Sequence, residues 1–416
     1  MKSTFAPVAA LLISVSILLT GQGLQGTLLP VRASLEHFPT LAIGAMGAAY
    51  FVGFTLGCLK GGELVRRVGH VRVFIAMSAL ASASPLLHAL IVQPVAWGLL
   101  RGVTGFCFAA LYLVIESWLN ESSTNETRGI VFSTYAMITL TVLALGQMLT
   151  LLYDPADFEL FIIASVLVSI GAVPIALSTS PTPEIPHTAS VDIKRLFQIS
   201  PSGTLGCLVS GFANGAFWSL APVFAVGISG GTALAAWFMT SAVVGGALTQ
   251  WPIGLLSDKF SRRGTLIAVT LLCGVCGLAL GIFGQSLSII AVIGLGALWG
   301  SLAFPLYTIS VAYANDHADP HEYVTVSSGL LLMYGVGATI GPFIASALMT
   351  LSGPSYLFVF ASIVHAALAL YVLMRSQRSE QSGIDTPMPF GDALTSAQTA
   401  SQVYEEEIAE EVENEK

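Results

Sequence analysis

The sequence predicts an all-α polytopic membrane protein with twelve transmembrane helices in two pseudo-symmetric halves of six. Three observations support this fold class. Only 10% of the 416 residues are charged and 54% are hydrophobic, whereas soluble domains carry about 25% charged residues. Twelve apolar runs are long enough, at about 20 residues, to cross a bilayer. The second half of the chain also repeats features of the first, as many two-part membrane folds do.

The apolar runs are separated by short polar breaks. The first run follows a single Lys2 and is not closely followed by a small-residue cleavage site, so we interpret it as an uncleaved span rather than a signal peptide. Breaks such as RASLEHFPT, DPAD and SGPS contain turn formers and charges. The expected spans are residues 8–30, 41–62, 72–92, 95–118, 129–152, 158–178, 204–227, 232–256, 265–285, 288–313, 324–350 and 355–374.

The longest internal break, residues 179–203, is polar and proline-rich and lies between spans six and seven. It divides the chain into an N-terminal six-helix half (1–178), a linker (179–203), a C-terminal six-helix half (204–374) and a tail (375–416). The tail is acidic and low in apolar residues, so we expect it to be disordered. A shift of 195 places Leu111 and Tyr112 on Leu306 and Tyr307, and a shift of 192 places Gly62 on Gly254.

Basic residues indicate the orientation of the spans. If the N-terminus is inside, the inner segments hold fourteen of the sixteen Lys and Arg residues, and the outer loops hold only Arg32. Cytoplasmic loops of membrane proteins carry such an excess of basic residues. We therefore expect both termini and the linker to be cytoplasmic.

Two charged turns interrupt the apolar chain, PIGLLSDKFSRRG at 252–264 and GGELVRRVGHVR at 61–72. Both resemble motif A of the major facilitator superfamily. The second-half copy matches that motif at Gly254, Asp258, Lys259, Arg262 and Arg263, with Ser261 where a glycine is usual. The first-half copy matches at Gly62, Arg67 and Gly69, and Glu63 substitutes for the acidic residue from one turn earlier.

These turns have two possible roles. In the first, Asp258 with Arg262, and Glu63 with Arg67, latch neighbouring helices together in one conformation and release them in another. In the second, the turns are solvated positive-inside loops of the kind that any membrane protein has.

Span four carries a further resemblance to the same superfamily. RGVTGFCFAALY is similar to motif B at Arg101, Gly105 and Ala109, and ESWLNESSTNETRG resembles the end of that span at Glu116, Arg128 and Gly129. With QWPIGLLSDKF and YGVGATIGP, these stretches most resemble the YcaD-like branch of bacterial permeases, over residues 1–375. The resemblance implies a location in a bacterial inner (plasma) membrane. Span five lacks the Gly-Pro signature of drug antiporters, which weakens an antiporter interpretation.

Polar residues inside spans are costly in lipid and are often functional. Arg101 is either a cavity charge for substrate or coupling, or a side chain snorkelling to the outer interface. Glu116 is a gate or proton carrier that pairs with Arg66, Arg67 or Arg128, or an ordinary interfacial carboxylate. The resemblance implies that spans one, four, seven and ten line a central cavity, although amides and aromatics also serve as helix-packing contacts. The candidate substrate or coupling residues are Gln22, Gln25, Arg101, Tyr112, Asn214, Trp218, Trp299 and Tyr307.

These observations favour a secondary active transporter that moves a small organic solute by alternating access, with protons as an optional coupling ion. Because no acidic residue lies at midspan, we expect a neutral or anionic substrate. The alternatives are a drug or metabolite efflux antiporter and a non-transporting membrane sensor or scaffold. An enzyme is not expected, since neither H-E-x-x-H nor G-x-S-x-G is present.

No bound group or macromolecular partner is implied by the composition. Cys273 and Cys276 form a C-x-x-C pair, but they lie in an apolar span and we interpret them as buried thiols. We expect no cofactor, no metal and no nucleic acid, and a monomeric transporter in a lipid bilayer with a small-molecule solute.

Overall fold

The computed structural model describes residues 9–124, 127–177, 193–229, 231–319, 322–376 and 389–393. Residues 179–192 of the expected linker, and residues 377–388 and 394–416 of the expected disordered tail, lie outside this part of the chain. The described residues contain helices, turns and loops but no β-strand, and twelve of the crossings they form are long and apolar enough to span a membrane. The predicted all-α, twelve-span fold class is therefore confirmed.

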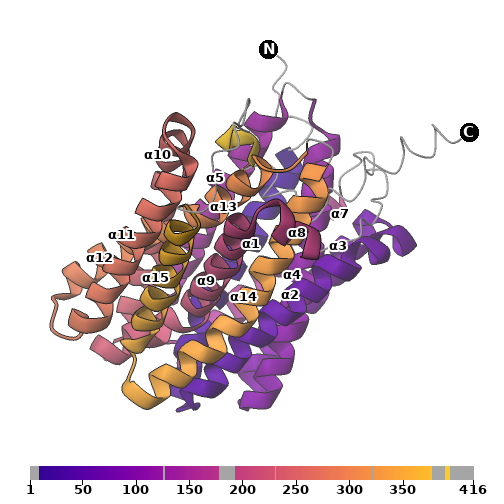
Figure 1. Cartoon of the computed structure of the whole chain (residues 1–416). Helices are drawn as coiled ribbons and strands as arrows, with labels where there is room; N and C mark the ends of the chain where they lie inside the picture. Colours follow the sequence, from indigo (N-terminus) through magenta and orange to yellow (C-terminus); the bar gives the residue numbers. More distant parts are fainter. Residues whose placement is uncertain are drawn as a thin grey trace, which may run out of the picture.

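The first six crossings pass back and forth through the bundle, shown in indigo to magenta in Figure 1. Crossings five and six are each completed by a short second helix. The elements are α1 (Ala9–Leu35), α2 (Thr40–Val68), α3 (His70–Leu90), α4 (Pro94–Glu121), α5 (Arg128–Met148) with the 3-10 helix η1 (Leu149–Leu151), and α6 (Glu159–Gly171) with α7 (Val173–Ala176).

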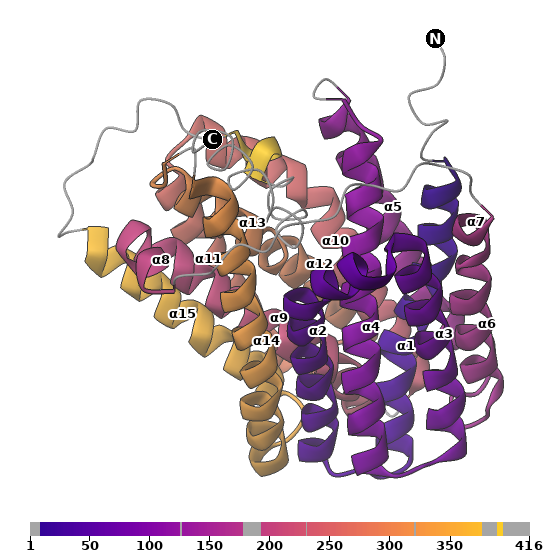
Figure 2. The same ribbon diagram turned by 90° about the vertical axis from the view of Figure 1, so that its right-hand side faces the viewer.

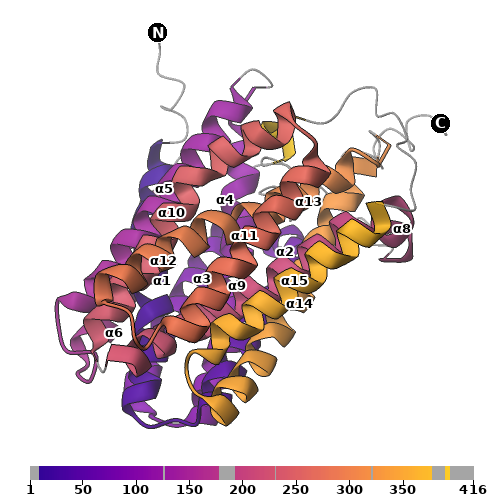
Figure 3. The ribbon, with the colours of Figure 1, turned by 60° about the vertical axis from the view of Figure 1, so that its left-hand side comes forward.

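The second six crossings follow a short helix that precedes them, α8 (Ile193–Ile199). They are shown in pink to yellow in Figure 3, which views the bundle from their side. The elements are α9 (Pro201–Ser229), α10 (Thr232–Lys259), α11 (Arg262–Phe283), α12 (Ile289–Ala303) with α13 (Pro305–Asn315), α14 (Tyr323–Ser352) and α15 (Tyr356–Ser376).

At two prolines the helices differ from the expected spans. The first span was expected to end at Pro30, but α1 continues through it to Leu35. The tenth span was expected to be continuous, but it is divided between Ala303 and Pro305. Proline has no N–H to bond to the preceding turn and is favoured at the first position of a helix, so Pro305 begins α13.

Equivalent helix pairs in the two halves pack through glycines. Between α2 and α4, a Cβ added at Gly105 would lie 2.0 Å from the carbonyl oxygen of Tyr50. Between α10 and α12, a Cβ added at Gly300 would lie 2.2 Å from the carbonyl oxygen of Ala242. Small residues allow membrane helices to approach to backbone contact. Close packing at a glycine thus joins the corresponding helix pairs, α2 with α4 and α10 with α12.

The two halves meet toward one end of the bundle. We call the end where α1 begins and α15 ends the terminal end, and the other the opposite end; Figure 2 shows the terminal end at the top. Toward the opposite end, Gly44 of α2 lies against Ser346 and Pro342 of α14. On the other side of the bundle, Thr240 of α10 donates a 3.3 Å hydrogen bond to the Gln147 side chain of α5.

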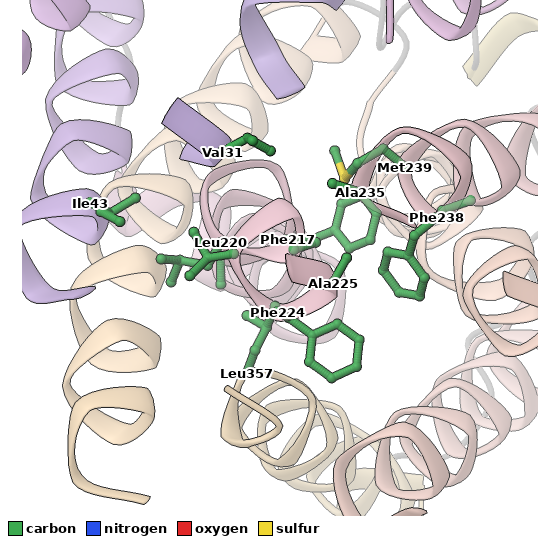
Figure 4. Close-up of a cluster of buried hydrophobic side chains, with 14 of the residues drawn as sticks. Val31, Ile43, Phe217, Leu220, Phe224, Ala225, Ala235, Phe238, Met239 and Leu357 are labelled. Carbon is green, nitrogen blue, oxygen red and sulfur yellow. The ribbon is translucent and has the colours of Figure 1, made fainter. Parts of the chain in front are cut away.

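A large apolar core also joins the halves. Figure 4 shows part of it around α9, where Phe217, Leu220 and Phe224 are fully or almost fully buried. Val31 of α1 and Ile43 of α2, both from the first half, belong to the same cluster. This core lies at the level where α1 ends and α2 begins, so it supports the contact between halves toward the opposite end.

Candidate functional site

A cavity of about 410 Å³ lies between the two halves. The described residues that line it come from α1, α2, α4 and α5 of the first half and from α9, α13 and α14 of the second. Most of the polar lining belongs to the first half. The polar and aromatic lining residues are Gln22, Gln25, Tyr50, Phe51, Phe54, Thr55, Cys58, Arg101, Thr104, Phe108, Tyr112, Gln147, Trp218, Ser219, Tyr307, Ser328 and Tyr334.

A hydrogen-bonded chain crosses the first-half wall of the cavity. The hydroxyl of Tyr112 donates to Oε1 of Gln22 at 2.8 Å, and Nε2 of Gln22 donates to the hydroxyl oxygen of Tyr50 at 2.9 Å. Three helices, α4, α1 and α2, therefore hold one another's side chains in place. Because Tyr50 accepts the bond from Gln22, its own O–H remains available to donate to a bound molecule.

Arg101 stacks on the same tyrosine. Its guanidinium carbon lies 4.2 Å from the centre of the Tyr50 ring, within the range of a cation–π contact. The guanidinium carries five N–H donors. No carboxylate among the described lining residues neutralises the charge. The wall formed by Arg101 and Tyr50 is thus rich in hydrogen-bond donors.

The second-half wall is aromatic with fewer polar groups. The rings of Tyr307 and Tyr334 lie edge to face with their centres 5.0 Å apart. Trp218 stacks on Phe304, with 5.6 Å between ring centres and 7° between ring planes. Asn214 hydrogen-bonds to Tyr334. This wall offers flat apolar surfaces opposite the donors of the first half.

Gln25 is the least satisfied of the lining amides. Its side chain is 2% exposed, and neither Nε2 nor Oε1 has a hydrogen-bond partner within the described residues. A buried amide left without partners is costly. Its place beside the cavity is consistent with a bound molecule or water as its partner.

Six of the eight candidate substrate residues line the cavity together: Gln22, Gln25, Arg101, Tyr112, Trp218 and Tyr307. The other two lie behind its surface. Asn214 is 4% exposed and reaches the cavity through Tyr334. Trp299 is fully buried and stacks on Phe217 at 4.8 Å, so it is a core residue and not a lining residue.

Sequence reasoning missed the contribution of α2 and α14. Tyr50, Phe54 and Cys58 line the cavity one helical turn apart along α2, and Tyr334 lines it from α14. The i, i+4 spacing of these three α2 residues was the available signal. Gln147 of α5 also lines the cavity and was not among the expected residues.

The second-half charged turn forms a buried ion-pair network. Nη2 of Arg262 lies 2.8 Å from Oδ1 of Asp258, the pair expected from the sequence, and its Nε lies 3.1 Å from Oδ2 of Asp316. Arg262 and Asp316 are only 7% and 4% exposed. Nearby, Arg263 donates to the carbonyl of Val372, and Lys259 lies 6.0 Å from the Phe260 ring. Asp316 was not anticipated because it is distant in sequence.

The first-half charged turn is arranged differently. Glu63 forms its ion pair with Lys60, at 3.5 Å, rather than with Arg67 as expected. Helical side chains lean toward the N-terminus, which directs Glu63 toward the preceding turn that carries Lys60. Gly69 ends α2 with a φ of 88°, a conformation that L side chains rarely adopt. Gly62 has nothing within 4 Å of an added Cβ.

Glu116 lies within the first half, near the terminal end of α4. It is 6% exposed and accepts a hydrogen bond from Tyr135 of α5. It also lies close enough to Tyr112 and Cys58, two lining residues, to interact with them electrostatically. The side chain of Arg128 and the surroundings of Gly129, at the start of α5, lie outside the described part of the structure.

Gly105 and Ala109 of the span-four motif do not line the cavity. Both face α2, where an added Cβ at Gly57 would lie 2.6 Å from that of Ala109. The lining positions of α4 are instead Arg101, Thr104, Phe108 and Tyr112. Within the described residues, no group of three or more His, Cys, Asp or Glu side chains could hold a metal ion.

Comparison with known families agrees with this architecture. The sequence profile described as Major Facilitator Superfamily matches residues 11–328 and 203–399. A protein from Salmonella newport (strain SL254), described as an uncharacterized MFS-type transporter YcaD, is 26% identical over 394 residues, covering 94% of this chain and 99% of its own. Its counterpart from Escherichia coli O17:K52:H18 is 28% identical over 380 residues, covering 90% and 97%.

Solved structures show the same fold at low sequence identity. The nucleoside transporter NupG superimposes with a TM-score of 0.75 at 12% identity, covering 90% of this chain and 100% of that one. FucP in the outward conformation superimposes with a TM-score of 0.57 at 16% identity, covering 91% and 100%.

Proposed function

The chain belongs to the major facilitator superfamily, and on that premise we propose that it is a secondary active transporter that moves a small organic solute by alternating access. It is an integral membrane protein and a transporter rather than an enzyme. The observation that carries the proposal is the cavity between the halves, because both halves contribute to its wall. A site shared by two repeats is the arrangement that rocking motions can expose alternately to each side.

The state described here has its halves joined toward the opposite end. The contacts of Gly44 with Ser346 and of Thr240 with Gln147 close the cavity on that side. We propose that the terminal end is cytoplasmic, since the expected inner loops hold fourteen of the sixteen basic residues. The structure then corresponds to a state open toward the cytoplasm of a bacterial cell, in its inner membrane.

The lining favours a neutral or anionic substrate. Arg101 and the O–H of Tyr50 offer donors on one wall, and the described lining residues include no carboxylate that would attract a cation. Trp218, Tyr307 and Tyr334 offer aromatic faces on the other wall. We therefore propose a solute with a hydrogen-bond-accepting end, such as a carboxylate or a carbonyl, and a flat or apolar body.

We further propose that protons couple to transport through Glu116. Its carboxyl is buried, bonded to Tyr135 of α5, and close to the lining residue Tyr112. A proton taken up there would change the hydrogen bonding between α4 and α5 beside the cavity. One structural neighbour, FucP, is described as a fucose:proton symporter, although that likeness extends only to the fold.

The test is solute flux in proteoliposomes. Candidate solutes are first ranked by the rise in apparent melting temperature of purified protein, since a ligand that binds only the folded state stabilises it. Uptake of the best candidates is then compared between wild type and Glu116→Gln, with and without a pH gradient. If the pH gradient changes the flux in wild type but not in Glu116→Gln, both transport and proton coupling through Glu116 are supported. If the gradient does not change the flux in wild type, the protein transports without protons and is a uniporter. Absence of flux for every stabilising solute favours the sensor or scaffold alternative.

A further inference from the structure

A short piece of the C-terminal tail is seated on the terminal end of the second half, away from the central cavity. Residues 389–393 form one helical turn, in which the N–H groups of Asp392 and Ala393 both donate to the carbonyl of Pro389. Phe390 and Ala393 are 4% and 0% exposed, whereas Asp392 faces solvent. We call these five residues the tail turn. One face of the tail turn is thus as buried as the protein core.

The aromatic ring of the tail turn occupies an apolar pocket. Phe390 packs in one cluster with Leu266 of α11, Ile309 of α13 and Val372 of α15. Gly254 of α10 provides the floor, since a Cβ added there would lie 2.1 Å from Cδ1 of Phe390. The glycine of the charged turn therefore has a second use, which is to leave space for this ring.

The backbone of the tail turn binds the charged turn itself. The N–H of Phe390 lies 3.1 Å from Oδ1 and 3.0 Å from Oδ2 of Asp258. The same carboxylate accepts from Arg262 at 2.8 Å. A carboxylate has about four acceptor positions. The single N–H of Phe390, shared between both oxygens, and Nη2 of Arg262 together occupy three of them.

We propose that the tail turn is a reversible intramolecular lock that holds the second-half charged turn in the state described here. Closing the terminal end requires the last turn of α10, which carries Asp258, to approach the first half, because the halves are already joined toward the opposite end. While Asp258 is bound to Phe390 and Arg262, it has little capacity for a new partner on the first half. Seating of the tail turn therefore favours the state whose cavity faces the terminal end.

The covalent connection makes such a lock effective without a strong contact. Only residues 377–388 separate the tail turn from the end of α15. A short connection of this kind keeps the local concentration of a segment at about the millimolar level. A contact of modest affinity then stays occupied most of the time and can still open during each transport cycle.

Two variants displace the tail turn in independent ways. Phe390→Ala removes the ring, and Gly254→Ala places a methyl group where the ring lies. If both act through the same contact, Gly254→Ala should have no further effect in a chain that already carries Phe390→Ala. Asp392→Ala is the matched control, because this residue lies on the exposed face of the same turn.

A native thiol reports the conformation. Cys58 is partly exposed and lines the cavity, whereas the other four cysteines are buried. A membrane-impermeant maleimide applied from the terminal-end side of oriented vesicles should therefore react with Cys58 in the state described here. We expect Phe390→Ala, Gly254→Ala and truncation after residue 388 each to slow this labelling about fivefold or more, as for a typical coupling between states. Asp392→Ala should leave the labelling rate unchanged.

Adding the missing segment back as a peptide distinguishes a specific lock from a general loss of stability. A synthetic peptide of residues 385–397, added to the truncated protein on the terminal-end side, should restore the labelling rate, and the same peptide with Phe390→Ala should not. Unchanged or faster labelling in Phe390→Ala, or an equal effect of Gly254→Ala with and without Phe390, would overturn the proposal. If the truncated chain does not fold, Gly254→Ala decides the question in the full-length chain. The labelling needs no substrate, so its outcome is independent of whether the transported solute has been found.

Discussion

At the scale of single residues, the placement of Arg101 explains how a charge can persist within the bundle. Its guanidinium carbon lies over the Tyr50 ring, and Gln22, itself bonded to Tyr112, holds that ring in position through the tyrosine hydroxyl. The contact with the ring therefore holds the cation in place, and its N–H groups can donate to a bound molecule. An ammonium group can also contact an aromatic ring, but it cannot present two parallel donors to one carboxylate.

We accordingly predict that Arg101→Lys loses most transport activity. If the substrate carries a carboxylate or phosphate, loss of the paired hydrogen bonds should raise its KM roughly tenfold to a hundredfold, which corresponds to about 1.5–3 kcal/mol. Arg101→Ala should lose more. The measurement is uptake into proteoliposomes at equal protein content over a range of substrate concentrations.

A second arginine provides the control for this experiment. Arg32 lies in the last turn of α1 and pairs with Glu36 at 2.6 Å, outside the cavity lining. Arg32→Lys keeps the charge and should keep transport near the wild-type level. Equal rates for Arg101→Lys and wild type would remove the anionic-substrate proposal and leave a neutral solute.

A surface ion pair gives a prediction for pH. Nε and Nη2 of Arg195 on α8 each lie 3.0 Å from one oxygen of Glu322, next to α14. These bonds favour the carboxylate, so the pKa of Glu322 is lowered from its ordinary 4.5. The resulting stability is fully present above the ordinary pKa and is lost as pH falls through the lower folded-state pKa. Arg195→Gln should therefore lower the melting temperature at pH 7, with a difference that shrinks below about pH 4.5.

The expected size of this effect is small. The two side chains are 49% and 31% exposed. Exposed pairs contribute about 0–1 kcal/mol, so the melting temperature should change by a few degrees at most. Glu322→Gln should give the same shift at pH 7, and the double variant should add little to either single one. A difference that persists undiminished at pH 3 would show that Arg195 stabilises the protein through packing and not through this pair.

The sequence predicted some site residues and not others for a physical reason. Arg101 and Gln22 stand out because polar groups are rare in apolar helices. Tyr50 and Tyr334 do not stand out, because aromatic residues are ordinary components of spans, and their contribution depends on how each helix is rotated about its axis. Trp299 was expected with Tyr307 at the substrate site, but Pro305 begins a new helix between them, and only Tyr307 lines the cavity.

At the scale of helices, the repeat in the sequence is a repeat of contacts. Gly105 and Gly300, 195 residues apart, both bring their helix to the backbone of a neighbour. Gly146 and Gly341, also 195 apart, do the same between α5 and α1 and between α14 and α9. At these positions the neighbouring backbone leaves no space for a Cβ atom, so only glycine fits. This steric requirement explains why the repeat is visible in the sequence at these positions.

Adding a methyl group at such a contact should be harmful. Gly105→Ala would place Cβ 2.0 Å from a backbone oxygen of α2, which cannot move as a side chain could. We predict a loss of about 1–3 kcal/mol of stability, the usual range for overpacking, seen as a lower melting temperature and a smaller yield of folded protein. Gly98→Ala, on the same helix, is the control because nothing lies within 4 Å of its added Cβ. An equal effect of the two substitutions would contradict the packing argument.

Helix boundaries were predictable because they depend on the residues nearby in the sequence, namely the apolar run itself and the polar turn segment that follows it. The expected spans differ from the observed helices by a few residues at most ends, and α2 extends six residues beyond its expected end at 62 to Val68. Its last turns carry Lys60, Glu63 and Arg67, charges that end an apolar run without ending a helix. Hydropathy therefore locates the part of a helix that crosses lipid but not the part that projects beyond it.

At the scale of the whole molecule, the contacts between the two halves could not be predicted from the sequence. The contacts of Gly44 with Ser346 and of Thr240 with Gln147 join residues that are more than 90 positions apart. Neither contact has a signature in its local sequence, and a transporter forms and breaks such contacts during its cycle. What the sequence does predict at this scale is the orientation, because the distribution of basic residues depends only on the order of the loops.

The orientation can be tested with two exposed positions at opposite ends of the bundle. Glu121 lies at the end of α4 on the terminal end, and Ser286 lies in the loop between α11 and α12 on the opposite end; both are exposed. In a Cys58→Ser background, Ser286→Cys should react with an impermeant maleimide in intact cells. Glu121→Cys should react only after the membrane is permeabilised. The physical reason is that the expected inner loops hold fourteen of the sixteen basic residues, and cytoplasmic loops carry the excess of such residues.

The reverse pattern would change more than the topology. Under the proposal that the contacts at the opposite end close the cavity there, labelling of Glu121→Cys in intact cells would mean that the cavity opens to the outside. Asp258 and the tail turn would then also lie there. The buried network of Arg262 with Asp258 and Asp316 would then act at the outer gate. Because the two cysteines lie on opposite sides of one bundle, they must react from opposite sides of the membrane. Reaction of both from the same side would contradict the twelve-span fold itself.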